Sequence, residues 1–454
     1  MNNWRKVKLD TVADIKLSNV DKKTTEGEKP IRLCNYTDVY KYSFINKEKS
    51  QDFMIATCND NEYEKFLLKK GQVAITKDSE KRNDIGIPTF IAEDFEDVVL
   101  GYHLALITPY SDKLDGAFLH FWLNTEYGKK YFENNASGSG QRLTLTLDII
   151  KSIPLYLPDL PTQKSIAKVL SDLDAKIELN NKINRELEAM AKTLYDYWFV
   201  QFDFPDANGK PYKSSGGKMV YNAELKREIP EGWEAGTLGK IAELVRGVTY
   251  DSSEIKDEND EDTIPVLRAT NITGNVLDLD NMVYVPKQNV SKIQLLNRFD
   301  ILITMSSGSK EHIGKNGFYY FDKEVSFGAF CAKIVAKKDF RYYLYSYTQS
   351  EFMFATIKNE CLGTNINNLN GSLVKGFKLV LPPIDLVKKF NEKVQSIYET
   401  IGNNHKQNQH LTALRDWLLP MLMNGQVRVK EAALRQAQDE ISMAAEPSVK
   451  YGKL

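Results

Sequence analysis

Residues 166–198 read IAKVLSDLDAKIELNNKINRELEAMAKTLYDYW, and this stretch decides the fold. Apolar side chains recur in it at alternating steps of four and three residues, from Ile166 through Leu187 to Trp198. This spacing places them on one stripe of an α-helix about 48 Å long, at about 1.5 Å per residue. An apolar stripe alone is also typical of a helix packed inside one domain, so a second observation is needed.

The same pattern returns 224 residues further along the chain, where Phe390 corresponds to Ile166 and Leu411 to Leu187. This duplication favours a coiled coil of two helices. The side chains of the predicted seam are Ile166, Leu170, Leu173, Ile177, Asn180, Asn184, Leu187, Leu194, Phe390, Val394, Ile397, Ile401, Asn404, Asn408, Leu411 and Leu418.

Two asparagines lie near the middle of the seam in each copy. Asn180 and Asn184 would therefore meet Asn404 and Asn408 whether the helices run parallel or antiparallel, and the amides would satisfy one another. The linker after the first helix most simply places the second half of the chain at the far end, which predicts antiparallel helices. A linker of about 30 residues also spans the whole helix at about 3.3 Å per residue, so a parallel pair stays open.

The segments that precede the two helices are duplicated as well. Trp4 corresponds to Trp233, Gly101 to Gly328, and the sequence VAIT at 73–76 returns as ILIT at 301–304. Apolar patterns predict strands near 73–76, 98–107, 143–157, 301–304 and 325–335, and helices over 116–132 and 340–358. The two halves are therefore expected to share one fold while differing in most side chains.

The ends of the long helices also have sequence signals. Thr162 is the expected N-cap of the first helix, which should end near Phe199. The second helix should begin near Asp385, be interrupted at Pro420 and stop at Gly425.

Composition excludes few classes of protein. The chain has 454 residues, of which 42% are hydrophobic, so two or more domains are expected. A formal net charge of −1 argues against a wholly basic nucleic-acid coat but allows local basic faces. The four cysteines have no CxxC spacing and are expected to be reduced thiols. No apolar leader or run of about 18 apolar residues is found, so a cytoplasmic location is expected.

Motifs for catalysis are weak. The stretch from Gly308 to Lys315 is one residue too long for a phosphate-binding loop, and Asn316 stands where a magnesium-binding hydroxyl belongs. Asp206 and Glu224 resemble the acidic pair of a nuclease, but they lie in a polar linker. The histidines lack the context of a metal ligand or a general base and are expected to be structural or to lie at the surface.

Two pairs of polar loops occupy matching places in the halves, near 77–83 and 306–312 and near 137–144 and 363–368. Each loop alone is equally well explained as a solvated turn, but their duplication favours contacts with DNA phosphates and base edges. The candidate DNA-binding residues are Lys77, Lys81, Arg82, Asn83, Ser139, Gln141, Arg142, Thr144, Ser306, Ser307, Ser309, Lys310, His312, Thr364, Asn365, Asn367 and Asn368.

Several short motifs follow one another in a fixed order along the chain. They are Leu157-Pro158-x2-Pro161-x-Gln163, Leu173-Asp174-x-Lys176-Ile177, Tyr197-Trp198-Phe199, Ile229-Pro230-Glu231-Gly232-Trp233 and Leu418-Leu419-Pro420-x-Leu422-Met423-Asn424-Gly425. In this order and with this duplication, the chain resembles the specificity subunits of type I restriction-modification enzymes.

The resemblance implies a mixed α/β (α+β) fold with two duplicated target-recognition domains in a pseudo-twofold arrangement. Two long helices forming an antiparallel coiled coil should separate these domains. The expected segments are target-recognition domain 1 (1–158), the first spacer helix (159–200), a linker (201–230), target-recognition domain 2 (231–382), the second spacer helix (383–425) and a disordered tail (426–454).

It also implies a non-catalytic protein that recognises an interrupted site in double-stranded DNA. Two methyltransferase subunits should dock on it, and restriction subunits should join through the complex. The chain itself should bind no cofactor and no metal, while S-adenosylmethionine, ATP and Mg²⁺ belong to the partner subunits. No membrane partner is expected. Two alternatives stay open from the residues: a coiled-coil scaffold that joins two protein-binding domains, and a nuclease that uses Glu224.

Overall fold

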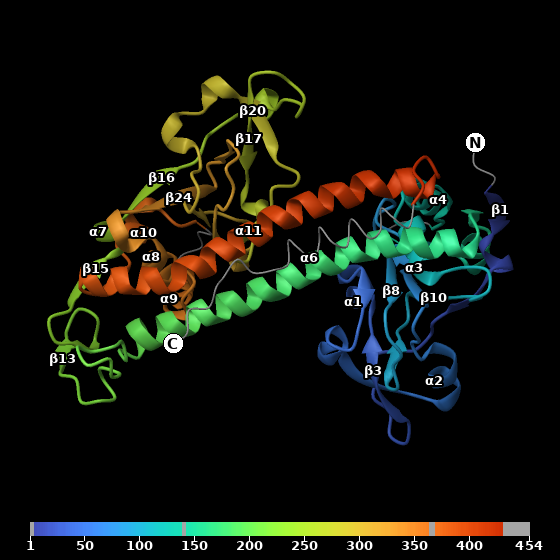
Figure 1. The fold of residues 1–454 in the computed structure, drawn as a ribbon, viewed down its shortest axis with the longest axis horizontal. Helices are drawn as coiled ribbons and strands as arrows, with labels where there is room; N and C mark the ends of the chain where they lie inside the picture. Colours follow the sequence, from blue (N-terminus) through green and yellow to red (C-terminus); the bar gives the residue numbers. More distant parts are fainter. Residues whose placement is uncertain (1–3, 139–141, 363–367, 430–454) are drawn as a thin grey trace. The chain divides into compact units, whose positions relative to one another are not determined.

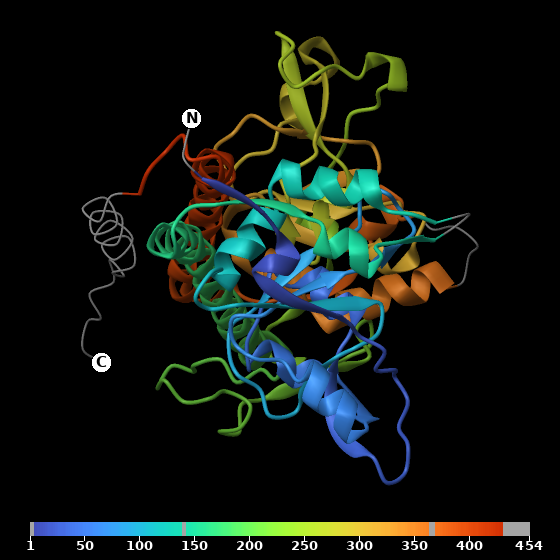
Figure 2. The same cartoon turned by 90° about the vertical axis from the view of Figure 1, so that its right-hand side faces the viewer.

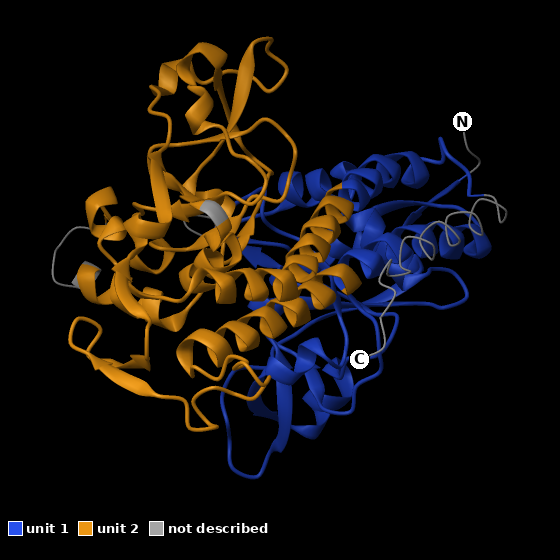
Figure 3. Ribbon diagram, turned by 60° about the vertical axis from the view of Figure 1, so that its left-hand side comes forward, with its two compact units in different colours: residues 1–178, 410–454 blue, residues 179–409 orange. Residues whose placement is uncertain are grey.

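The computed structural model describes residues 4–138, 142–362 and 368–429. The chain forms two compact units, residues 1–178 with 410–454 and residues 179–409 (Figure 3). The borders of both units fall within the long helices, so each unit contains one globular half and parts of two helices. From residue 430 onward, the tail expected to be disordered lies outside the described residues.

The globular half of unit 1 is built on a five-stranded sheet (Figure 1). The strand order is β2 (Ala13–Leu17), β10 (Leu104–Pro109), β6 (Val73–Thr76), β8 (Pro88–Ile91) and β4 (Phe44–Ile45). β6 is buried along its whole length because the sheet is covered on both faces: Val73 and Ile75 lie in one hydrophobic cluster and Ala74 in another. This double burial explains why the strand reads as a continuous apolar run.

A second sheet and five helices complete this half. The sheet has the order β5 (Met54–Cys58), β3 (Lys29–Cys34) and β9 (Val98–Leu100), with β3 and β9 parallel. The helices are α1 (Tyr36–Lys41), α2 (Asp60–Phe66), α3 (Gly116–Leu123), α4 (Glu126–Asn135) and α5 (Leu147–Lys151). Two short antiparallel pairs join β1 (Arg5–Lys8) to β12 (Pro154–Leu157) and β7 (Asp78–Ser79) to β11 (Leu143–Thr144).

Unit 2 repeats this plan. Its main sheet has the order β16 (Ala242–Arg246), β24 (Cys331–Ala336), β21 (Ile301–Thr304) and β22 (Asn316–Phe318). A second sheet has the order β20 (Val283–Pro286), β17 (Thr263–Leu267) and β23 (Ser326–Phe327), again with one parallel pair. Short pairs join β15 (Glu234–Thr237) to β25 (Lys378–Leu381), β18 (Ile272–Thr273) to β19 (Val276–Leu277), and β13 (Met219–Asn222) to β14 (Arg227–Pro230).

Unit 2 has counterparts of α3, α4 and α5, and it has a short helix between β15 and β16 where unit 1 has a 3-10 turn, Leu9–Thr11. The helices of its globular half are α7 (Leu238–Ile241), α8 (Arg341–Thr348), α9 (Glu351–Leu362) and α10 (Gly371–Lys375). The duplicated mixed α/β fold predicted from the sequence is therefore confirmed.

Two long helices, α6 (Leu160–Tyr195) and α11 (Ile384–Met423), lie side by side in Figures 1 and 2. In unit 2, Asn180 Nδ2 donates to Asn408 Oδ1 at 2.8 Å, and Asn404 Nδ2 donates to Asn184 Oδ1 at 2.8 Å. The partner's number falls as the number on α6 rises, so the helices are antiparallel, as predicted. In unit 1, Asp174 on α6 pairs with Arg415 on α11 at 2.9 Å.

The predictions of an N-cap at Thr162 and of an interruption at Pro420 need correction. α6 begins at Leu160, because Asp159 rather than Thr162 supplies the cap: Asp159 Oδ1 accepts the backbone N–H of Thr162 at 2.8 Å. α11 is not interrupted at Pro420 but continues to Met423. A proline so close to the C-terminal end removes one backbone hydrogen bond while little helix remains beyond it.

Five predicted elements are interrupted in the structure. The strand expected over 98–107 is β9 and β10, and the strand expected over 325–335 is β23 and β24, because the chain turns and changes sheets at each break. The strand expected over 143–157 contains α5. Each predicted helix is two helices: Thr125 caps α4, and the Ser350 hydroxyl accepts the backbone N–H of Met353 at the start of α9.

The linker 201–230 contains the β13–β14 hairpin, and its aromatic residues pack on the second half of the chain. Phe204 stacks on Trp233 with ring centroids 5.0 Å apart, and both side chains are buried. No helix in the described part of the chain has a stretch long and apolar enough to cross a membrane.

Candidate nucleic-acid interface

The structure brings the two candidate loops of unit 1 together. β7, which follows β6 directly, pairs with β11, so that Asp78 lies opposite Thr144 and Ser79 opposite Leu143. The backbone N–H of Leu145 donates to the carbonyl of Lys77 at 2.7 Å and fixes the crossing. Residues separated by more than sixty positions in the sequence therefore form one surface.

Gly86 closes the first of these loops. It has a φ of 77°, a left-handed conformation that favours glycine, and a Cβ at this position would lie 2.2 Å from the ring of Phe132. Gly314 has the same role in unit 2, with a φ of 82° and Ile357 against it. Both loops thus return to the sheet through equivalent turns.

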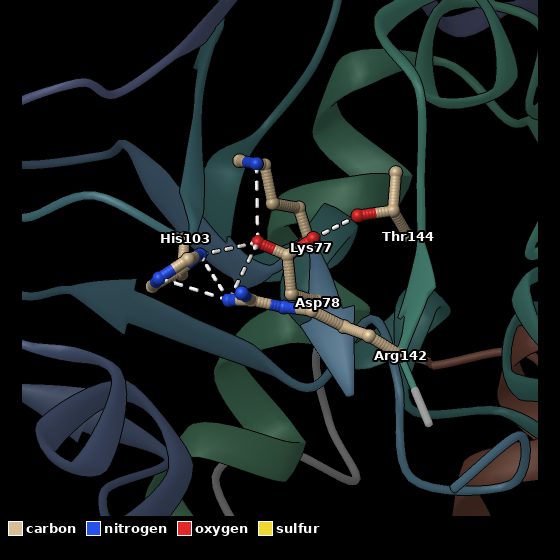
Figure 4. Close-up of polar contacts among 5 residues, drawn as sticks. All are labelled: Lys77, Asp78, His103, Arg142 and Thr144. Carbon is tan, nitrogen blue, oxygen red and sulfur yellow. Dashed lines mark hydrogen bonds and ion pairs between the residues drawn. The ribbon is translucent and has the colours of Figure 1, made fainter. Parts of the chain in front are cut away.

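A buried carboxylate organises the donors in unit 1 (Figure 4). The Asp78 side chain is only 8% exposed, and it accepts hydrogen bonds from the Lys77 ammonium at 3.1 Å and from the Thr144 hydroxyl. Nδ1 of His103 lies 2.5 Å from Asp78 Oδ2, and Nη2 of Arg142 lies 3.7 Å from the same oxygen. One negative charge therefore holds two permanent cations and an imidazole in fixed positions.

Arg142 is the outermost member of this cluster. Its side chain is 59% exposed, and Nη2 lies 2.7 Å and 2.9 Å from the two ring nitrogens of His103. The guanidinium therefore lies against the imidazole, whose Nδ1 is also within hydrogen-bond distance of Asp78. This chain of contacts orients Arg142 while leaving much of its guanidinium in solvent, where it can bind a phosphate or a base edge.

His103 itself has strained backbone geometry, with a φ of 68° in the left-handed region. It lies in the turn between β9 and β10, and its carbonyl accepts the backbone N–H of Lys77 at 3.0 Å. The turn thus contributes to the same surface as the two loops. Backbone strain of this kind is often found at functional sites.

These side chains border a surface pocket of about 520 Å³. Its lining residues are Tyr36, Asp78, Ser79, Glu80, Lys81, Asp84, His103 and Arg142. Tyr36 stacks on Tyr40, and the Tyr40 hydroxyl donates to Asp84 at 3.3 Å. Burial, followed by the charge of Asp84, raises the pKa of Tyr36, so this phenol stays protonated as a donor. The pocket combines cations, carboxylates and aromatic edges, which suits a polar ligand.

The other candidates of unit 1 have different surroundings. Lys81, Arg82 and Asn83 are exposed, but the Arg82 guanidinium donates to the carbonyls of Glu133 and Ala136 at 3.1 and 3.0 Å. Arg82 therefore ties its loop to the end of α4. Ser139 and Gln141 lie outside the described residues.

Unit 2 has the same crossing with different chemistry. Ser306 pairs with Asn368, and the backbone N–H of Leu369 donates to the carbonyl of Met305 at 2.7 Å. Met305 and Ser306 thus stand where unit 1 has Lys77 and Asp78. An apolar residue and a neutral hydroxyl replace the cation and the carboxylate, so unit 2 lacks the charge cluster at this position.

Four further candidates of unit 2 lie in one loop. Ser307 and Ser309 are partly buried, the Ser309 hydroxyl bonds to Glu311, and Lys310 and His312 are exposed in a 3-10 turn. Lys315 Nζ lies 3.2 Å from Nδ1 of His312. Thr364, Asn365 and Asn367 lie outside the described residues.

The acidic pair considered for a nuclease serves local structure. The Asp206 carboxylate accepts the backbone N–H groups of Asn208 and Lys210, both at 2.8 Å, and Glu224 lies in the turn of the β13–β14 hairpin. In the described part of the chain no three His, Cys, Asp or Glu side chains are grouped so that they could hold a metal ion.

Sequence reasoning missed Asp78, His103 and Tyr36 as members of this surface. Asp78 lies inside a candidate loop, but the residues predicted to bind DNA from that loop are Lys77, Lys81, Arg82 and Asn83. The only available signal for His103 was Gly101, which matches Gly328 and marks a turn in both halves. Nothing in the sequence places Tyr36 beside the loops.

Comparison with known proteins identifies relatives of the chain. Residues 1–189 and 230–413 match the family model described as Type I restriction modification DNA specificity domain. The chain is 29% identical over 321 residues to the type I restriction enzyme MjaIX specificity subunit of Methanocaldococcus jannaschii, which covers 70% of this chain and 71% of that protein.

It is also 24% identical over 490 residues to the type I restriction enzyme HindI specificity subunit of Haemophilus influenzae, covering 94% of this chain and 100% of that protein. Among solved structures, the S subunit of a type I restriction-modification system from M. genitalium superposes with a TM-score of 0.52 at 17% identity, covering 92% of this chain and 96% of that one. This structural likeness concerns the fold.

Proposed function

Because the chain belongs to the family of type I restriction-modification specificity subunits, we propose that it directs a methyltransferase complex to an interrupted site in double-stranded DNA. The globular half of unit 1 recognises one part of the site and the globular half of unit 2 recognises the other. The chain supplies recognition and assembly, and the reacting groups belong to its partners.

One observation carries this proposal: the same loop crossing occurs in both units with different side chains. In unit 1 the crossing holds Lys77, Asp78 and Thr144, and in unit 2 it holds Met305, Ser306 and Asn368. A repeated backbone with substituted donors is what two readers of different base sequences require, since the backbone sets position and the side chains set the hydrogen-bond pattern.

Recognition in unit 1 follows from the contacts of Asp78. Lys77 and Arg142 provide positive charge for DNA phosphates, while the exposed edge of the Arg142 guanidinium matches the paired acceptors of a guanine in the major groove. Because Asp78 and His103 hold Arg142, less side-chain entropy is lost on binding than for a free arginine.

The second part of the proposed function, spacing and assembly, belongs to the two long helices. Their antiparallel seam fixes the register of α6 against α11 through the asparagine pairs. We assign to these helices the spacing between the two recognition halves and the docking of two methyltransferase subunits. Restriction subunits join through that complex. S-adenosylmethionine, ATP and Mg²⁺ are bound by the partner subunits.

The test is a map of adenine methylation in cells that express the full chain with its methyltransferase partner. In one exchange variant, residues 1–158 of this chain are replaced by the corresponding segment of a second specificity subunit. In the other variant, residues 231–382 are replaced in the same way. We expect methylation at a two-part sequence, of which each exchange alters one part and leaves the other unchanged.

Two results would contradict the proposal. Methylation that does not depend on this chain would favour a scaffold that joins two protein-binding domains. Methylation of a continuous sequence, changed as a whole by either exchange, would show that the two halves do not recognise separate parts of the site.

A further inference from the structure

Phe330 is an exposed aromatic residue in a rigid turn of unit 2. It lies between β23 and β24, and 68% of its surface is exposed, the largest fraction among the described large hydrophobic residues. No described residue makes an aromatic-ring or cation–π contact with it. Burying this ring against a partner would remove apolar surface from water, which is favourable.

The repeat places Phe330 at the position that His103 occupies in unit 1. In unit 1 the backbone N–H of Lys77 donates to the His103 carbonyl at 3.0 Å, and in unit 2 the N–H of Met305 donates to the Phe330 carbonyl at 2.8 Å. Both turns begin with a glycine, Gly101 or Gly328, whose N–H donates at 2.8 Å to a strand of the second sheet. The two turns differ locally, because only His103 has a positive φ.

The backbone around Phe330 is held firmly. Its carbonyl also accepts the N–H of Ser306 at 3.1 Å, and the N–H of Cys331 donates to Gly328 at 2.8 Å within the turn. A Cβ on Gly247 would lie 2.1 Å from the Gly328 carbonyl, so a second backbone segment presses against the turn. The backbone that carries the ring is therefore fixed before binding, so that the turn itself needs no ordering when a partner binds.

The neighbouring loop is suited to DNA. Ser306, which donates to the Phe330 carbonyl, begins the candidate loop that also carries the exposed Lys310 and His312. Ser306 is in turn paired with Asn368 from the other candidate loop. Phe330 thus stands at the crossing of the two loops, among hydrogen-bonding and cationic groups, where unit 1 has its imidazole.

We propose that Phe330 is a specificity-determining residue that contacts the 5-methyl group of a thymine in the part of the site recognised by unit 2. The inference rests on the proposed function and adds the chemistry of one contact. In the major groove the thymine methyl group is the apolar feature that distinguishes a T·A pair, and phenylalanine is a side chain suited to it. A ring without donors or acceptors makes no hydrogen bond to the other base edges.

The test uses the full chain with its methyltransferase partner. The DNA duplex carries the sequence that this complex methylates. Each thymine in the unit 2 part of the site is replaced singly by deoxyuridine, which lacks only the methyl group. One replacement should weaken binding by wild-type protein about fourfold, equivalent to about 0.8 kcal/mol for one methyl-sized group. The Phe330→Ala variant should bind the two duplexes equally, and Phe330→Leu should retain part of the difference.

Two control variants isolate the contact. Tyr221 is a comparably exposed aromatic residue, 65% exposed, in the β13–β14 hairpin. The Tyr221→Ala variant should keep the full deoxyuridine effect. The Ile55→Ala variant should also keep it, because Ile55 is an exposed apolar residue of β5 in the other unit.

The inference is overturned if no deoxyuridine replacement separates wild type from Phe330→Ala, or if this part of the site contains no T·A pair. A uniform loss of affinity in Phe330→Ala, equal for thymine and deoxyuridine, would make the ring a wedge between base steps and would also overturn it. Failure of wild-type protein to prefer its methylated sequence over other DNA would instead contradict the proposed function.

Discussion

At the scale of single residues, Asp78 is the unexpected member of the surface. A carboxylate near a DNA phosphate is electrostatically unfavourable, yet Asp78 contacts Lys77, His103 and Thr144 directly and lies within ion-pair distance of Arg142. We interpret it as a positioning residue. Its negative charge weakens the attraction of this surface for the DNA backbone, but its contacts fix the directions of the Lys77 and Arg142 side chains.

This interpretation predicts opposite effects on affinity and on specificity. Asp78→Asn removes one negative charge, so binding to unrelated DNA should be unchanged or stronger and its salt dependence steeper. Discrimination between the correct unit 1 half-site and single-base variants should fall by about 1 to 3 kcal/mol, as expected for a lost base contact. Binding titrations with specific and unrelated duplexes at two salt concentrations measure both quantities.

Arg142→Ala is the matched variant, and it should weaken both kinds of binding. Arg32→Ala serves as a control for the loss of a cation, because Arg32 pairs with Asp97 at 2.8 Å in the second sheet. If Asp78→Asn preserves the ratio of specific to unrelated affinity, Asp78 does not position Arg142 for DNA.

The site was only partly predictable at this scale. Duplication identified the loops that carry Lys77, Arg142 and Ser306, because a repeated polar loop is informative even in one sequence. It could not show that a third segment, the turn with His103, meets them. That contact depends on the switch of the chain from one sheet to another between β9 and β10, and a run of apolar residues looks the same on both sides of a tight turn.

At the scale of elements, the long helices were the most predictable part of the fold. Their spacing specified the apolar stripe and the positions of the asparagines without knowledge of any contact. The shorter helices were less predictable, because α3 and α4 are separated by a break of two residues, Asn124 and Thr125, across which the apolar pattern continues. Only the capping hydroxyl of Thr125 marks the boundary, and a threonine in a sequence is not by itself evidence of a helix cap.

The asparagine pairs of the seam should stabilise register more than they stabilise the fold. Asn404→Leu leaves the buried Asn184 without the hydrogen bond it now receives, which should lower the free energy of unfolding by about 1 to 3 kcal/mol. The double variant Asn184→Leu with Asn404→Leu removes both polar groups and should recover most of that loss. Urea unfolding of the single and double variants measures the coupling.

Asn403→Leu is the control, because Asn403 is exposed on the same helix and should change stability little. Equal and additive losses from Asn184→Leu and Asn404→Leu would contradict the idea that the two amides act as a pair.

At the scale of the whole molecule, the chain has two units with separate hydrophobic cores, and a histidine is buried in unit 1 and another is partly buried in unit 2. Burial, assisted by the charge of Arg415, lowers the pKa of His120 in unit 1 to about 4. Burial alone lowers the pKa of His405 in unit 2 to about 4, and its ring stacks on Tyr320. Both imidazoles are therefore neutral in the folded chain at neutral pH.

This arrangement predicts that acid destabilises the two units separately. The ordinary pKa of a histidine is 6.5, so between about pH 6.5 and pH 4 the unfolded chain binds a proton that the folded unit does not. Stability is therefore lost as the pH falls, by about 2 kcal/mol for each histidine between pH 7.5 and pH 5. Calorimetry should resolve two unfolding transitions, both of which move to lower temperature at pH 5.

His120→Leu tests the assignment of one transition to unit 1. The described structure gives Nδ1 of His120 no hydrogen-bond partner, so an apolar side chain of similar size removes both an unsatisfied atom and the proton-binding group. The unit 1 transition should become less sensitive to pH, while the unit 2 transition keeps its response through His405. His410→Leu, which alters an exposed histidine on α11 in the same unit, should leave both responses unchanged. A single transition whose pH response His120→Leu alters as a whole would show instead that α6 and α11, which run through both units, couple the two cores into one cooperative structure.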